Sequence, residues 1–123
     1  MLTIGSLVLG VSDMARAVAF WTAALDYVPR GGLVEDDWTV LEPAAGTGVQ
    51  LALGLSESPV QRHPRVHLDL YARDAADQAA EVERLLALGA RDVDWDLYPE
   101  DPDFVVLADT EGNVFCVIDT SHG

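Results

Sequence analysis

The sequence has little cysteine, few basic residues and no long apolar run, and each shortage excludes a class of protein. Its one cysteine, Cys116, excludes an internal disulfide and is typical of a reducing cytosol. No Cys-x-x-Cys or paired Cys/His spacing indicates structural zinc. No segment is apolar over the length of a membrane span, and the first residues lack the layout of a signal peptide. We therefore expect a cytoplasmic protein with no membrane partner.

Basic residues number 7 against 21 acidic ones, which gives a net charge of −14. A field of that sign repels phosphate backbones and anionic lipids, so nucleic acid is not an expected partner. A cationic small molecule would be attracted. The charge has a second interpretation, since a net negative charge also keeps a protein soluble without any ligand.

The apolar pattern indicates an α+β fold. At 123 residues, half of them apolar, the chain is expected to form one domain, 1–123, with a real core. Helical spacing and capping residues predict helices near 13–26 and 74–89. A short edge strand is expected after the first helix, within "DYVPRGG". The other predicted strands are 3–11, 37–43, 48–54, 65–72, 90–95, 103–109 and 113–119.

The same order of elements occurs twice, on either side of the polar segment 55–64. "DWTVLEPAAG" (37–46) also matches "DFVVLADTEG" (103–112), with Trp38 and Phe104 at equivalent positions. We interpret the chain as two tandem β-α-β-β-β modules, 1–56 and 64–120.

The stretch "RVHLDLYARD" (65–74) has two unlike faces, because strand side chains alternate across a sheet. Val66, Leu68 and Leu70 are assigned to packing against the second helix. The other row consists of His67, Asp69 and Tyr71. Such a row faces either bulk water or an enclosed pocket, and a mixture of apolar and polar groups is typical of a ligand cleft.

Three segments resemble the vicinal oxygen chelate superfamily, in particular its bacterial glyoxalase-like members: "LVLGVSDMARAVAFWTAAL", "RVHLDLYARD" and "FVVLADTEGNVFCVID". The superfamily also includes extradiol dioxygenases, fosfomycin-resistance enzymes and bleomycin-binding proteins. The resemblance implies two modules whose mixed sheets curl around a cleft, commonly within a homodimer, and a small-molecule ligand in that cleft. It also implies that the row of His67, Asp69 and Tyr71 faces the cleft.

Metal-dependent members place ligands, usually His or Glu, at positions that correspond here to Ser6, Gln50, His67 and Cys116. Only His67 matches directly, and Ser6 is a poor ligand for a divalent ion. Cys116 is either a thiolate ligand or a small buried hydrophobe. We therefore expect no metal and no other cofactor.

The predicted catalytic residues are His67 and Asp69, because a carboxylate two residues away can orient an imidazole as a general base. A purely structural hydrogen bond is the alternative. The expected ligand-binding residues are Trp38, Gln50, Tyr71, Trp95, Tyr98, Phe104 and Cys116. Trp95 and Tyr98 lie in the acidic segment 92–103, which is either a solvated loop or a lip for a cationic ligand.

Three functions follow from these predictions. The preferred one is metal-independent binding of a small molecule, with acid–base chemistry at His67 and Asp69. The alternatives are sequestration of a cationic antibiotic, as in bleomycin resistance, and a metal-dependent lyase or dioxygenase reaction.

Overall fold

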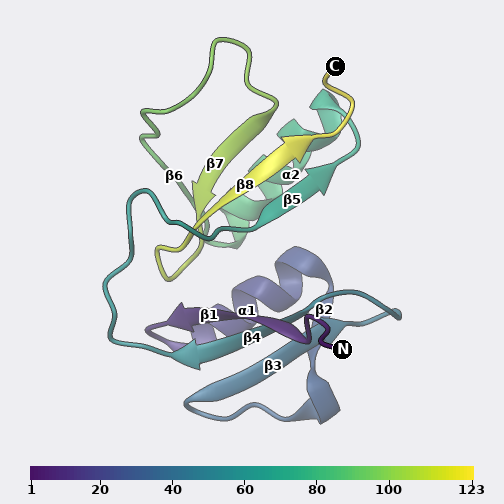
Figure 1. Ribbon diagram of the computed structural model, residues 1–123, viewed down its shortest axis with the longest axis vertical. Coiled ribbons are helices and arrows are strands. Elements are labelled where there is room, and N and C mark those ends of the chain that lie inside the picture. The colour runs from purple at the N-terminus through teal and green to yellow at the C-terminus, as the bar shows by residue number, and fades with distance from the viewer. The chain divides into compact units, whose positions relative to one another are not determined.

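The computed structural model describes residues 1–123 and divides into two compact units, Met1–Pro59 and Val60–Gly123. Each unit contains one sheet and one long helix (Figure 1). The first unit consists of β1 (Ser6–Val11), α1 (Met14–Leu25), β2 (Tyr27–Pro29), the 3-10 turn η1 (Arg30–Gly32), β3 (Trp38–Pro43) and β4 (Gln50–Leu55). The second consists of β5 (Asp69–Ala72), α2 (Ala75–Leu88), β6 (Arg91–Asp92), β7 (Phe104–Ala108) and β8 (Val114–Asp119). The predicted α+β fold of two β-α-β-β-β modules is confirmed.

The two sheets have the same topology. Their strand orders are β1-β4-β3-β2 and β5-β8-β7-β6. In each sheet the first strand of the module runs parallel to the last, and the other neighbours are antiparallel. The last strand is therefore central, and the first strand lies at an edge.

Each helix covers one face of its own sheet, where the apolar side chains of the strands are buried. In the first unit, Phe20 and Trp21 of α1 pack edge-to-face with ring centroids 5.0 Å apart. They share a core with Leu41 and Leu53. The second core contains Leu85 of α2 together with other apolar residues, including Leu107, Phe115 and Val117. Burial of these large side chains, each contributing about 1.5–3 kcal/mol, stabilises each module around its own sheet.

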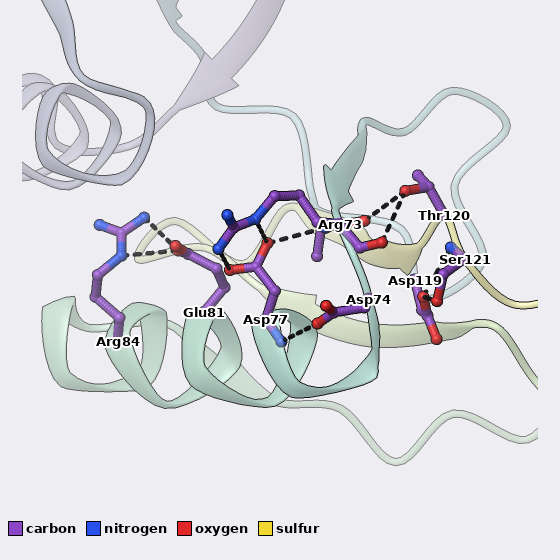
Figure 2. A network of polar contacts seen from close by, with 9 residues as sticks. Arg73, Asp74, Asp77, Glu81, Arg84, Asp119, Thr120 and Ser121 are labelled. Atoms are coloured by element: carbon purple, nitrogen blue, oxygen red, sulfur yellow. Dashed lines mark hydrogen bonds and ion pairs between the residues drawn. The ribbon is translucent and has the colours of Figure 1, made fainter.

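The helices begin where the capping residues predict. The Asp13 carboxylate accepts a hydrogen bond from the Arg16 backbone at 3.1 Å, and Asp74 accepts one from Asp77 at 2.8 Å. Asp77 also accepts hydrogen bonds from the backbone and guanidinium of Arg73, as Figure 2 shows. The bonds to Asp13 and Asp74 satisfy backbone donors that the first turn of a helix leaves free.

The helix α2 ends at Gly89, whose φ of 119° suits glycine. A Cβ at this position would lie 2.9 Å from Thr110, so the glycine also permits close packing.

A buried aspartate holds the turn between β7 and β8. Asp109 is fully buried, and its Oδ1 accepts backbone hydrogen bonds from Glu111 at 2.9 Å and Asn113 at 2.8 Å. A buried carboxylate is tolerated when donors of this kind satisfy it. The "DTEGN" segment thus joins the central strand to its antiparallel neighbour in a fixed register.

The first strand of each module is shorter than predicted. Ordered pairing begins at Ser6 and Asp69 rather than at Thr3 and Arg65. Alternation identifies which residues can form a strand, but hydrogen bonds to the neighbouring strand decide where the ladder begins. Val66 precedes this ladder and is 71% exposed, so its predicted packing against α2 is wrong.

Candidate functional site

The centre of the candidate site is a cluster of His67, Asp69 and Cys116 in the second unit. The potential ligand atoms of the three side chains all lie within 4.8 Å of one another. His67 Nε2 lies 3.0 Å from Asp69 Oδ1, and both side chains are nearly half exposed, at 42% and 49%. Cys116 is 6% exposed and forms the floor of the cluster. Two polar groups that solvent can reach therefore lie over a buried thiol.

The pairing of β5 with β8 brings these residues together. Asp69 is the register partner of Cys116, so their side chains project from the same sheet face. The Cys116 backbone N–H donates to the Leu68 carbonyl at 2.9 Å, which fixes the chain beside His67. His67 lies two residues before β5 begins, and its Nε2 lies 3.0 Å from the Asp69 carboxylate.

The thiol of Cys116 is poorly ionised in this environment. Burial raises the pKa of the thiol to about 11, and the nearby charge of Asp69 contributes to the increase. Both effects disfavour the thiolate. In the absence of a cation, Cys116 is a neutral thiol at physiological pH.

In the first unit, Ser6 and Gln50 are register partners on β1 and β4. The Gln50 amide oxygen accepts a hydrogen bond from the Arg30 guanidinium at 3.2 Å. Arg30 was not among the residues singled out in the sequence, because only the chain reversal at η1 brings it to Gln50. The Gln50 oxygen is already bonded to a positively charged guanidinium, and with the Ser6 hydroxyl it makes a weak pair of ligands for a metal ion.

The sheet registers of the two modules align Cys116 with a different residue of the first module than the resemblance implies. Trp38 begins β3 and pairs with Gly54, and Phe104 begins β7 and pairs with Ile118, which agrees with their predicted equivalence. The next pairs on the same face are Val40 with Ala52 and Val106 with Cys116. In sheet register, Cys116 therefore corresponds to Ala52 rather than to Gln50.

Two of the predicted aromatic residues lie on the same sheet face as the cluster. Tyr71 and Phe104 are both register partners of Ile118, one row along from Asp69 and Cys116. Tyr71 is 80% exposed. Phe104 stacks against Tyr98 with ring centroids 5.2 Å apart, and the Tyr98 hydroxyl accepts a hydrogen bond from the Val106 backbone at 2.7 Å.

The other two predicted aromatics, Trp38 and Trp95, do not belong to the strands of the second sheet. Trp38 is 41% exposed and belongs to the first unit. Trp95 contacts His63, with ring centroids 5.1 Å apart, and His63 Nε2 lies 2.7 Å from Asp96 Oδ1. Arg62 reaches the Asp94 carbonyl at 3.3 Å. Part of the acidic loop is thus held by residues of the preceding linker.

A match over nearly the whole chain identifies the family. The glyoxalase-like domain family matches residues 6–118, which include nearly all of both modules. The chain belongs to this family, within the vicinal oxygen chelate superfamily. No curated protein matches the sequence.

Solved structures show the same fold. A glyoxalase/bleomycin resistance protein/dioxygenase family enzyme from Burkholderia phytofirmans has a TM-score of 0.73 at 14% identity, covering 94% of this chain and 97% of that one. A glyoxalase-related enzyme from Fulvimarina pelagi has a TM-score of 0.69 at 18% identity, covering 96% and 88%. The fosfomycin resistance protein FosX from Listeria monocytogenes, complexed with Mn(II) and 1S,2S-dihydroxypropylphosphonic acid, has a TM-score of 0.70 at 14% identity, covering 96% and 92%. At these identities the likeness concerns the fold.

The glyoxalase-like chain contains a candidate metal-binding triad, although the set of four positions drawn from the resemblance fits a metal poorly. An imidazole, a carboxylate and a thiol are ligand types that zinc accepts, and three protein ligands leave one position open. Ser6 and Gln50 offer no comparable donors. Asp69 is not among those four positions, and its carboxylate lies 3.0 Å from the His67 imidazole.

Proposed function

We propose that this glyoxalase-like protein binds a small molecule on the sheet face that carries His67, and that His67 and Asp69 supply acid–base chemistry there. The observation that supports this proposal is the 3.0 Å contact between His67 Nε2 and Asp69 Oδ1. Asp69 begins β5 and His67 lies just before it, and solvent reaches both side chains. The proposed function does not use a metal at Ser6, Gln50, His67 and Cys116. We also expect the protein to work in the cytoplasm.

The geometry gives each residue a role. When Nε2 carries its proton and donates to the Asp69 carboxylate, the lone pair of the neutral imidazole is on Nδ1. That nitrogen is then available to take a proton from a bound molecule. The carboxylate holds the ring in position and stabilises the imidazolium that forms. Nδ1 can return the proton to the product.

Tyr71 and Phe104 supply apolar surface near these polar groups, with Tyr98 supporting Phe104. A site with a few polar groups among aromatic surfaces is typical for small ligands. Contacts of the ligand with Trp38, Gln50 and Trp95 stay predictions from the sequence.

A metal-dependent lyase or dioxygenase reaction is the second candidate, because His67, Asp69 and Cys116 lie close enough together to hold an ion. Elemental analysis of protein purified without chelator separates the two. A stoichiometric divalent metal would favour the metal-dependent reaction. Antibiotic sequestration would instead give tight binding of a cationic drug with no chemical change, as the net charge of −14 would favour.

The proposed function is tested by thermal-shift screening of small carbonyl compounds, organic acids and cationic drugs against the full chain. For a compound that raises the melting temperature, we expect His67→Ala to weaken binding roughly tenfold to a hundredfold, the cost of a lost hydrogen bond to a charged group. The unfolding free energy should change by no more than about 0.5 kcal/mol, since His67 is partly exposed and lies outside the core.

His63→Ala is the matched control, because His63 also contacts an aspartate on the same unit but lies in the linker. It should leave the affinity unchanged. If His67→Ala lowers stability strongly and leaves affinity intact, His67 is a structural residue and the proposed site is wrong.

A further inference from the structure

Two arginines have no bonding partner in a chain that is rich in carboxylates. All seven Lys/Arg positions hold arginine, against 21 acidic residues. Five of these arginines have side chains that contact an oxygen atom of another residue, namely Arg16, Arg30, Arg62, Arg73 and Arg84. The side chains of Arg65 and Arg91 form no hydrogen bond and no ion pair. An unpaired guanidinium keeps all its N–H donors available for an incoming oxyanion.

The hydrogen-bonded ladder of the second sheet determines the face from which Arg91 projects. Arg91 of β6 is the register partner of Ala108 on β7, and Ala108 pairs with Val114 on β8. Val114 precedes Cys116 by two residues on the same strand. Cross-strand partners share a face, and alternate residues of a strand return to it. Arg91 therefore projects from the sheet face that carries Cys116 and its register partner Asp69.

The side chains between Arg91 and the His67–Asp69 pair on this face carry no charge. Those on β7 and β8 belong to Val106, Ala108, Val114 and Cys116. None of them can neutralise a guanidinium. In the strand order β5-β8-β7-β6, the outer strands are three spacings apart, which is about 14 Å. The long side chain of Arg91 shortens this interval, so an extended small molecule can reach both Arg91 and Asp69.

We propose that Arg91 is a specificity-determining residue that binds the carboxylate of a small organic acid on this face. The inference rests on the proposed function, because it names the class of molecule that exchanges a proton with His67. A guanidinium can bond a carboxylate through two parallel N–H···O contacts, which fixes the orientation of the acid. The apolar body of the acid then extends toward Tyr71 and Phe104, one row beyond Asp69.

The net charge of −14 acts against this preference, because it repels anions at long range. Salt limits that repulsion, since the Debye length is about 8 Å at physiological ionic strength. The contact with Arg91 acts at hydrogen-bond distance and is screened much less. At this salt concentration we therefore expect the contact to outweigh the field. A cationic group in the same place would meet the guanidinium and be repelled.

The test uses phenylbutyrate, phenylbutyramide and phenylbutylamine, which share one apolar body and differ in charge. Their affinities for the full chain are measured by NMR titration at physiological salt. We expect the acid to bind roughly threefold to tenfold more tightly than the amide, as for an exposed charge-assisted pair, and the amine to bind most weakly. The Nε–H signal of Arg91, identified by its loss in Arg91→Gln, should shift with the acid and not with the amide.

Variants of Arg91 separate its charge from its shape. Arg91→Gln should abolish the preference for the acid over the amide. Arg91→Lys should restore part of that preference, because lysine keeps the charge but lacks the planar fork. Circular dichroism checks that each variant is folded.

Two further variants separate the contact with Arg91 from the effect of net charge. Arg84→Gln removes the same charge from α2, where Arg84 donates to Glu81 at 2.8 Å, and should leave the ratio of acid to amide affinity unchanged. Arg65→Gln removes the other unpaired guanidinium and should change the ratio less than Arg91→Gln does. Loss of the preference in Arg65→Gln alone would assign the carboxylate to Arg65 and overturn the proposal.

The proposal is also overturned if the amide binds as tightly as the acid, if Arg91→Gln keeps the preference, or if no probe binds at millimolar concentration. Failure of the proposed function gives a different result. In that case His67→Ala leaves the affinities of the probes unchanged, while Arg91→Gln still removes the preference for the acid. If His67→Ala weakens binding and Arg91→Gln keeps the preference, the proposed function stands and the role of Arg91 is wrong.

Discussion

At the scale of single residues, Cys116 of the central strand β8 lies beside Asp69 of β5, its register partner. Cys116 had two interpretations, a buried hydrophobe or a ligand, and its position on a central strand does not separate them. The register of β5 on β8 places Asp69 beside Cys116, and the sequence does not specify that register. The proximity of Asp69 to Cys116 could be stated only when that register was known.

The environment of Cys116 predicts slow alkylation. With a pKa of about 11, roughly one thiol in a thousand is ionised at pH 8, and the thiolate is the nucleophile. Iodoacetamide should therefore modify the metal-free native chain far more slowly than the unfolded chain, as followed by mass spectrometry. Asp69→Asn should accelerate the reaction, because removing the negative charge lowers the pKa of the thiol. Equal rates for native and unfolded wild type would contradict the burial of this thiol.

At the scale of elements, the bounds of the helices were predicted closely because capping residues at each end determine them. Asp13 and Asp74 cap the helices, and Gly89 ends the second. The limits of β1 and β5 were less accurate, since pairing with another strand determines them. Exposed Val66 shows the consequence: a residue with the right alternation contributes nothing to the core when the ladder starts after it.

The first turn of α2 predicts a specific dependence of stability on pH. Hydrogen bonds from the backbone and side chain of Arg73 hold the pKa of Asp77 below its usual range (Figure 2). A carboxyl with a lowered pKa in the folded state stabilises the fold at neutral pH, and that contribution is lost as the pH falls through the folded value. Asp77→Asn should therefore lower the urea midpoint at pH 7 and have a smaller effect near pH 3.

The control for this prediction is Asp36→Asn, which changes the charge equally at an exposed residue of the first unit. It should shift the midpoint little at either pH, since surface substitutions are usually small in effect. A pH-independent difference between Asp77→Asn and the wild type would show that Asp77 acts through shape alone and not through its charge.

At the scale of the whole molecule, the duplication was visible in the sequence because both modules repeat one order of elements. The residue-by-residue alignment of the last strands of the two modules was not visible in the sequence. The family resemblance implies that Gln50 and Cys116 are equivalent positions, whereas the sheet register matches Ala52 with Cys116. A shift of two residues leaves the same face exposed, so hydrophobic alternation is unchanged by it. Only the hydrogen-bonded ladder distinguishes the two alignments.

The open sheets favour association of two chains. Edge strands β1 and β5 each have one unpaired side, and exposed Val8 and Tyr71 lie on them. Unpaired edges with apolar side chains are covered in many proteins by a second copy. We therefore expect light scattering to give a mass of twice 13.2 kDa at micromolar concentration.

A charge on the edge strand should weaken this association. Val8→Lys places an ammonium group where the side chain is 55% exposed in one chain and would lose water in a dimer. Its mass should fall toward 13.2 kDa on dilution before that of the wild type does. Ala79→Lys, at an exposed position of α2, adds the same charge away from the strand edge and should leave the mass unchanged. A wild-type mass of one chain at every concentration would contradict the dimer, and the edges of β1 and β5 would then be tolerated in water.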